Sequence, residues 1–102
     1  MKHDYVNWVE INLSAIEKNT QILIESSQRP LMAVVKANAY GHGAVEVARA
    51  ALWAGASWLA VARYCEARIL REAGILAPIL VLGMVMPEEV DEAIQQQVTL
   101  CL

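Results

Sequence analysis

Cysteine, positive charge and long hydrophobic runs are all scarce in this 102-residue sequence. Cys65 and Cys101 are the only cysteines, which are too few for a disulfide scaffold and lack the paired spacing of a zinc site. Eight Lys and Arg residues stand against 11 Asp and Glu residues, so the net charge is −3 and no basic surface favours nucleic acid. These shortages predict a reducing compartment, no metal site and no nucleic-acid partner.

No stretch of the sequence is suited to a membrane. The longest apolar run, residues 75–86, contains Pro78 and Gly83 and is shorter than the roughly 20 residues that span a bilayer. No apolar signal region follows Met1. We therefore expect a soluble, cytoplasmic protein with no membrane partner.

The apolar content is high for so short a chain. Hydrophobic residues make up 57% of the sequence, against roughly 45–50% in typical soluble domains. A short chain has proportionally more surface, so this excess predicts surfaces that something else covers. The chain is at most one small domain, or it is part of a larger one.

The first third of the sequence predicts a strand followed by a helix. Residues 5–13 alternate in part between apolar and polar types, which is typical of a half-buried strand. Ser14 and Glu17 fit a capping box, so a helix should begin there and run to about residue 26. Three apolar side chains should form its buried stripe: Ile16, Leu23 and Ile24.

The remaining sequence alternates short apolar segments with helical patterns. The apolar segments begin near residues 31, 58, 79 and 98, and helical patterns occupy 44–54, 64–73 and the residues after Pro87. This alternation predicts about four parallel strands with intervening helices, in an α/β fold that is either an open doubly wound sheet or a closed barrel. Four parallel strands alone would leave two open edges, so we expect the sheet to continue beyond residue 102 or, less favourably, to be completed by a second copy.

Lys36 lies at a position typical of catalytic residues, the predicted carboxyl end of a buried strand. The run 31–35, bounded by Pro30, predicts a strand buried on both faces, with Lys36 as its last residue. Active sites of parallel α/β folds lie at the carboxyl ends of strands, although a lysine there can also extend to solvent along the surface. A lysine at such a position can form a Schiff base with a carbonyl such as that of pyridoxal phosphate.

The loop after Lys36 offers further polar groups. Tyr40 lies close enough in sequence to return its hydroxyl to the same site, or it packs on a helix. Gly41 and Gly43 give backbone amides freedom to approach an anion, but they match neither the dinucleotide nor the Walker pattern. His42 is more typical of a structural or exposed histidine than of a catalytic one. The residues alone predict a lysine Schiff-base site or an anion site.

Residues 33–43, Ala-Val-Val-Lys-Ala-Asn-Ala-Tyr-Gly-His-Gly, resemble the pyridoxal-phosphate attachment motif of bacterial alanine racemases. Residues 8–16, 54–62, 70–75 and 77–83 also resemble that family. The resemblance implies that residues 1–102 form the N-terminal part of a (β/α)8 TIM-type barrel domain that binds this cofactor. The later half of the barrel and the family's mostly β domain have no counterpart here.

The resemblance also implies an activity and its residues. Lys36 would hold pyridoxal phosphate as a Schiff base and act as the base on the D-alanine face, and Tyr40 would donate to the cofactor phosphate. Val34 and Leu82 would line the cofactor pocket. The activity would be interconversion of L- and D-alanine for peptidoglycan synthesis, in a homodimer whose partner supplies a tyrosine as the opposite-face base. No residue here corresponds to that tyrosine, so the isolated chain should be an inactive fragment.

Two residues depart from the family pattern. Arg63 and Cys65 stand where relatives more often carry an uncharged and an acidic residue. Arg63 would either add an anion contact or point to water, and Cys65 would either be reactive or be packed. Two other functions remain open: racemisation of another small amino acid such as serine, and cofactor binding without turnover.

Overall fold

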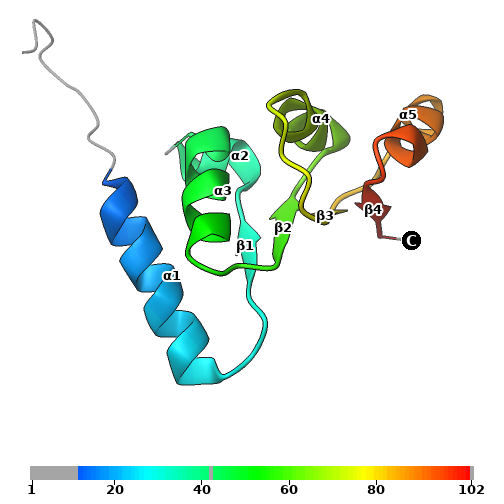
Figure 1. The fold of residues 1–102 in the computed structure, drawn as a ribbon. Helices are drawn as coiled ribbons and strands as arrows, with labels where there is room; N and C mark the ends of the chain where they lie inside the picture. The colour runs from blue at the N-terminus through cyan, green and yellow to red at the C-terminus, as the bar shows by residue number, and fades with distance from the viewer. Residues whose placement is uncertain (1–11, 42, 102) are drawn as a thin grey trace, which may run out of the picture.

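The computed structural model describes residues 12–41 and 43–101. Within these residues, four parallel strands form one sheet (Figure 1). The strands are β1 (Met32–Val34), β2 (Trp58–Val61), β3 (Ile79–Val81) and β4 (Thr99–Leu100). The four apolar segments of the sequence are therefore confirmed as strands, each somewhat shorter than its apolar run.

Helical segments connect the strands. They are α1 (Leu13–Ser27), α2 (Lys36–Tyr40), α3 (Ala44–Trp53), α4 (Tyr64–Glu72), the 3-10 helix η1 (Pro87–Glu89) and α5 (Val90–Gln95). The pattern in the sequence therefore predicted α3, α4 and α5 within a residue or two, apart from the 3-10 turn that begins at Pro87.

Every strand pairs with the next strand in the sequence. The order β1-β2-β3-β4 has none of the reversal that characterises a doubly wound sheet. In register, Ala33 pairs with Leu59 and Leu59 with Ile79, so these side chains share one face. The sequential order favours a barrel, in which successive βα units follow one another in the same direction.

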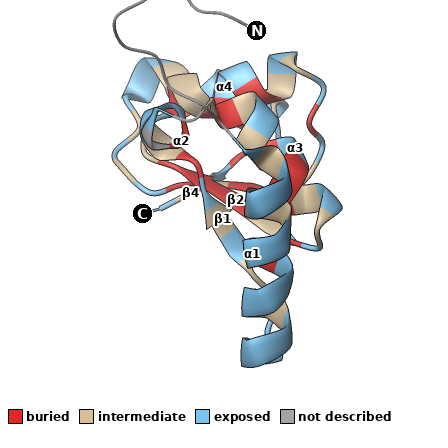
Figure 2. Ribbon diagram, turned by 90° about the vertical axis from the view of Figure 1, so that its left-hand side faces the viewer, coloured by how far each residue is buried: buried red, intermediate tan, exposed pale blue. Residues whose placement is uncertain are grey.

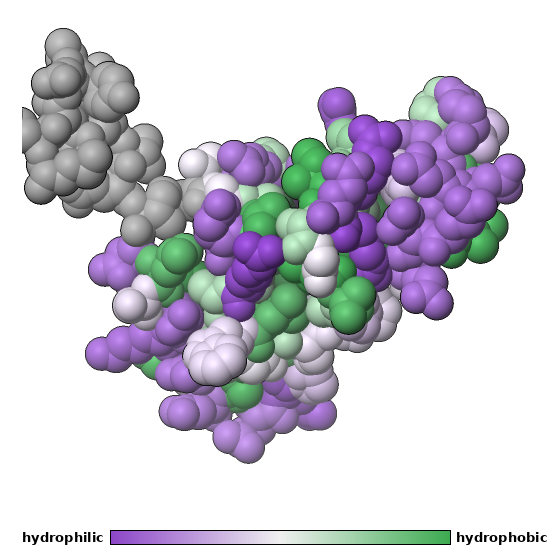
Figure 3. Space-filling view, turned by 45° about the horizontal axis from the view of Figure 1, so that its top comes forward, coloured by the Kyte–Doolittle hydropathy of each residue, from purple (hydrophilic) through white to green (hydrophobic). Residues whose placement is uncertain are grey.

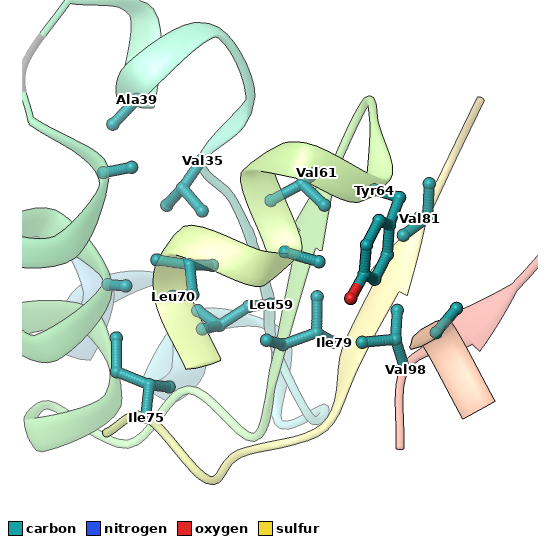
Figure 4. Packing of buried hydrophobic residues seen from close by; sticks show 14 residues of the cluster. Val35, Ala39, Leu59, Val61, Tyr64, Leu70, Ile75, Ile79, Val81 and Val98 are labelled. Atoms are coloured by element: carbon teal, nitrogen blue, oxygen red, sulfur yellow. The ribbon is translucent and has the colours of Figure 1, made fainter. Parts of the chain in front are cut away.

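The core lies between the sheet and the helices. Leu59, Val61, Ile79 and Val81 are fully buried and pack with small and large side chains of α3 and α4. Figure 4 shows these strand residues pointing toward α4 and the Leu70 side chain. The structure is only 21 Å thick along its shortest axis, which fits one layer of helices on one sheet.

The opposite face of the sheet is less covered. Met32 and Val34 of β1 are 39% and 41% exposed, so the prediction that this strand is buried on both faces is wrong. Alternate residues of a strand point to opposite faces, and among the described residues the helices pack on only one of them. The apolar surplus of the composition is partly explained by this face.

Helix α1 begins at a different residue from the one predicted. The Asn12 side chain caps it by accepting a hydrogen bond from the Ala15 amide at 3.0 Å, so Ser14 is not the cap. Leu13 is helical, and residues 5–11 of the predicted strand lie outside the described residues. Figure 2 shows α1 mostly exposed, and Leu23 is 57% exposed, because α1 packs on α3 rather than on the sheet.

Helix α4 follows the sequence prediction closely. Ala67 and Leu70 are buried, and Gly74 ends the helix region with φ +87°. Arg68 and Glu72, four residues apart on this helix, are in contact on its exposed side, with Nε and Oε1 3.8 Å apart.

Candidate active site

Lys36 lies just beyond the carboxyl end of β1. It is the first residue of α2 rather than the last residue of the strand, which corrects the predicted boundary. Val35 between them is 1% exposed, and its amide continues the sheet by donating to Ala60 O at 2.9 Å. The strand therefore still delivers Lys36 to the edge of the sheet where catalytic groups of parallel folds gather.

The three residues after Lys36 form a left-handed turn. Ala37, Asn38 and Ala39 have φ angles of 51°, 56° and 55° and ψ angles of 46°, 43° and 47°. This conformation costs about 1–2 kcal/mol for each L-residue, so the surrounding contacts must hold it. Asn tolerates such angles, but the two alanines on either side of it give no sequence signal for a left-handed conformation. The sequence therefore did not predict the turn.

Asn38 ties this turn to the start of α3. Its carbonyl oxygen accepts from the Gly43 amide at 2.9 Å, and its Oδ1 accepts from the Ala44 amide at 2.8 Å. The Gly41 amide also bonds inward, to carbonyl oxygens of Ala37 and Asn38 at 3.1 Å each. The two glycine amides are therefore used within the turn, and the expectation that they approach an anion is wrong.

Glu66 of α4 joins the carboxyl ends of two strands. Its Oε1 accepts from the amides of Ala62 and Arg63, which follow β2, at 2.9 and 2.8 Å. Its Oε2 accepts from the Ala37 amide at 2.5 Å, across 29 residues of sequence. The sequence alone does not single out Glu66, because a carboxylate in the first turn of a helix is common and its long-range partner cannot be seen in the sequence.

A hollow of about 420 Å³ opens beside Lys36. Its lining consists of Lys36, Ala37, Ala62, Arg63, Cys65 and Glu66. Arg63 is exposed and Cys65 half-buried, and these two residues, which depart from the family pattern, both line the hollow together with Lys36. With the top of the molecule turned forward, hydrophobic and strongly hydrophilic side chains lie interspersed across the middle of this face (Figure 3).

The other predicted site residues lie elsewhere. Val34 and Leu82 are 41% and 43% exposed, and Leu82 lines a separate hollow with residues that follow β3 and β4. Tyr40 ends α2, and the predictions made for its side chain and for His42 fall outside what the structure describes. The structure thus gathers Lys36, Arg63 and Cys65, and it does not bring Leu82 into the same hollow.

Two kinds of feature are absent from the described residues. Residues 12–41 and 43–101 hold no cluster of three or more His, Cys, Asp or Glu side chains suited to a metal ion. None of their helices is both long enough and apolar enough to cross a membrane.

The model of one protein family, described as the N-terminal domain of alanine racemase, matches residues 11–102. The chain belongs to this alanine racemase family. An alanine racemase of Halalkalibacterium halodurans is 56% identical over 104 residues, covering 98% of this chain and 27% of that protein. The chain therefore spans about a quarter of the length of such relatives.

Solved structures place the fold within the same family. The alanine racemase of Bacillus anthracis with bound L-Ala-P matches all of this chain and 27% of its own, with a TM-score of 0.91 and 46% identity. A histidine racemase of Leuconostoc mesenteroides matches 90% of this chain and 25% of its own, with a TM-score of 0.84 and 34% identity. The four parallel strands and their helices correspond to the N-terminal part of the TIM-type barrel of alanine racemases.

Proposed function

We propose that residues 1–102 are the part of an alanine racemase barrel domain that carries pyridoxal phosphate, with Lys36 as the attachment residue. The observation that carries this proposal is the place of Lys36. It stands at the carboxyl end of β1, beside an open hollow, in a chain that belongs to the racemase family. We also expect the protein to work in the cytoplasm, where amino acids and reduced cysteines are available.

The residues around Lys36 fit such a cofactor. The hollow of about 420 Å³ has room for a substituted pyridine ring, and it contains one primary amine. Pyridoxal phosphate, when bound, supplies a conjugated ring that stabilises negative charge at the substrate's α-carbon. Lys36 would bind the cofactor aldehyde and then move a proton at that α-carbon on the D-alanine face. Tyr40 would donate to the phosphate, and Val34 and Leu82, at the exposed ends of β1 and β3 outside this hollow, would line the rest of the cofactor pocket.

Racemisation also needs a proton donor on the opposite face of the α-carbon. We assign this group to a partner copy of the whole protein, so the active form would be a homodimer. The isolated 102-residue chain would then be inactive, because a site with one base and open to water has neither the geometry nor the solvent exclusion that the reaction needs.

Alanine is the proposed substrate. Relatives that are 50% and 56% identical to this chain are alanine racemases, and one structural neighbour holds L-Ala-P. A second candidate is a racemase of another amino acid, such as serine, and the histidine racemase among the structural neighbours supports it. Comparing the turnover of L-alanine, L-serine and L-histidine by the complete protein distinguishes the two.

The attachment of the cofactor can be tested directly. Lys2, Lys18 and Lys36 are the three lysines of the chain, so peptide mapping resolves them easily. After incubation with pyridoxal phosphate and reduction with borohydride, we expect the label on Lys36 and its loss in Lys36→Arg. Label on Lys2 or Lys18 alone, or no label in a folded protein, would refute the proposal.

A further inference from the structure

The Glu66 carboxylate connects the residue after Lys36 to the second strand. It accepts three backbone hydrogen bonds, of which two come from Ala62 and Arg63 and one from Ala37. Carboxylate acceptors make shorter and stronger hydrogen bonds to amides than neutral acceptors do. The side chain is only half-buried, but all three partners lie at the carboxyl ends of β1 and β2.

The Ala37 amide needs such an acceptor from outside its own turn. It belongs to the first left-handed residue, and the amides of a first turn have no partner within that turn. Later amides find acceptors within the turn or just before it: the Ala39 amide donates to Val35 O at 2.9 Å, and the Gly41 amide donates to Ala37 O at 3.1 Å. Glu66 therefore holds the turn where it begins, directly after Lys36.

The direction of the Lys36 side chain depends on this backbone. If Ala37 left its φ of 51° for the extended region that alanine prefers, the peptide joining it to Lys36 would rotate. The amine sits at the end of four rotatable carbons, so a small rotation at the backbone is enlarged at the amine. Misplacement of a reacting group by about 1 Å can cost roughly a hundredfold in rate.

We infer that Glu66 is the positioning residue for Lys36, fixing the left-handed turn that aims the amine into the hollow. This inference rests on the proposed role of Lys36 as the cofactor lysine. Glu66 itself takes no part in the chemistry. It acts through the Ala37 amide, so it affects the rate and the extent of the reaction of Lys36.

Two substitutions separate this role from general stability. In Glu66→Gln the remaining oxygen can keep the bonds to Ala62 and Arg63, and the new NH2 group then faces the Ala37 amide, where it cannot accept. Glu66→Asp keeps the charge but is one methylene shorter. Its carboxylate can therefore accept hydrogen bonds from the Ala62 and Arg63 amides without reaching the Ala37 amide. Glu72→Gln is the matched control, because Glu72 lies on the same helix with a side chain 70% exposed.

The test measures the reaction of Lys36 in the complete protein that carries this chain. The Lys36 amine condenses with the aldehyde of pyridoxal phosphate and releases one water. Borohydride then adds hydride to the C=N carbon, and the nitrogen takes a proton from water, which leaves a secondary amine. We expect Glu66→Gln and Glu66→Asp to slow labelling of Lys36 by roughly tenfold to a hundredfold. Amide hydrogen exchange of the cofactor-free protein should accelerate at Ala37 in both variants, while Glu72→Gln matches the wild type in both measurements.

The outcomes are distinct. If wild-type Lys36 is not labelled, the proposed function fails before this inference is reached. If wild-type Lys36 is labelled and both folded Glu66 variants react and exchange as the wild type does, the positioning role is refuted while the function stands. If Glu66→Gln does not fold, Glu66→Asp and the exchange protection of Ala37 in the wild type decide, and a rapidly exchanging wild-type Ala37 amide overturns the inference.

Discussion

Gly83 lies directly against the backbone of Ala62 where β2 and β3 end. The Gly83 amide donates to Ala62 O at 3.0 Å, and a Cβ atom built on Gly83 would stand 2.5 Å from that same oxygen. Side-chain carbons essentially never approach a carbonyl oxygen so closely. The two strand ends beside the hollow are therefore packed at a spacing that glycine alone permits.

Gly83→Ala should destabilise the protein by about 1–3 kcal/mol, because the new methyl group must push the two strand ends apart. The measurement is the free energy of unfolding by urea. Gly74→Ala is the comparison: a Cβ there meets no atom within 4 Å, so its cost comes only from the φ of +87° and should be about 1 kcal/mol. Equal effects of the two substitutions would contradict the steric explanation.

Arg71 holds together the turns that follow α4 and α5. Its guanidinium donates to the carbonyl oxygens of Gln96, Ile75 and Ala77 at 2.8 Å each and to that of Gln97 at 3.2 Å. Burial lowers the pKa of Arg71 from its ordinary value, because it removes water from around the charged guanidinium.

Arg71→Lys should therefore cost roughly 1.5–3 kcal/mol, because an ammonium group has three donors and cannot span the four carbonyls. Arg68→Lys, on the exposed side of the same helix, should change the stability by about 0.5 kcal/mol or less. Urea unfolding of both variants checks this, and a loss of stability at Arg68 as large as that at Arg71 would contradict the explanation by the carbonyl cluster.

These examples show what the sequence could and could not predict. Regular elements were predictable because their signals are local: four apolar runs became strands, and the helical pattern over residues 64–73 became α4. The exposure of Leu23 and of Val34 was not predictable. It depends on which elements cover that face of the helix or strand, whereas the sequence pattern shows only that the residue is apolar.

In the candidate site, too, local features were predictable from the sequence and long-range contacts were not. Lys36 was predictable from its position after an apolar run, and its place at a strand end depends only on local order. The bond from the Ala37 amide to Glu66 joins residues 29 apart, and the left-handed turn depends on that bond and on Asn38. Long-range contacts of this kind leave no periodic signal in a sequence.

Tyr64 carries a buried hydroxyl group that has no hydrogen-bond partner among the described residues. Figure 4 shows its ring among Ile79, Val81 and Val98. Burial, and then the neighbouring Glu92 carboxylate, raise the pKa of Tyr64 above its ordinary value of 10.0. Tyr64→Phe should thus be neutral or stabilising by up to about 1 kcal/mol near neutral pH, as judged by urea unfolding.

The same pKa shift predicts a dependence on alkaline pH. The folded state holds the Tyr64 proton more tightly than the unfolded state, so its contribution is fully present below pH 10.0 and is lost as the pH rises above that value. Tyr64→Phe has no such proton and should lose less stability than the wild type above pH 10. A parallel decline of both proteins would exclude Tyr64 as a cause of alkaline destabilisation.

Asn38 performs two tasks that substitutions can separate. It adopts φ 56° in the left-handed turn, and its Oδ1 accepts from the Ala44 amide at the start of α3, whose N-cap residue Gly43 has no side chain to do so. Asn38→Gly keeps the ease of the left-handed conformation and loses the cap, so it should cost about 1 kcal/mol. Asn38→Ala loses both and should cost about 2–3 kcal/mol.

Urea unfolding of the two Asn38 variants measures this difference, and labelling of Lys36 with pyridoxal phosphate and borohydride follows the turn itself. Asn38→Gly retains the backbone conformation after Lys36. Lys36 should therefore be labelled more completely in Asn38→Gly than in Asn38→Ala, even though both variants lack the cap. If the two variants label equally while their stabilities differ, the left-handed turn contributes to folding alone, and the direction of Lys36 is set by β1 and Val35.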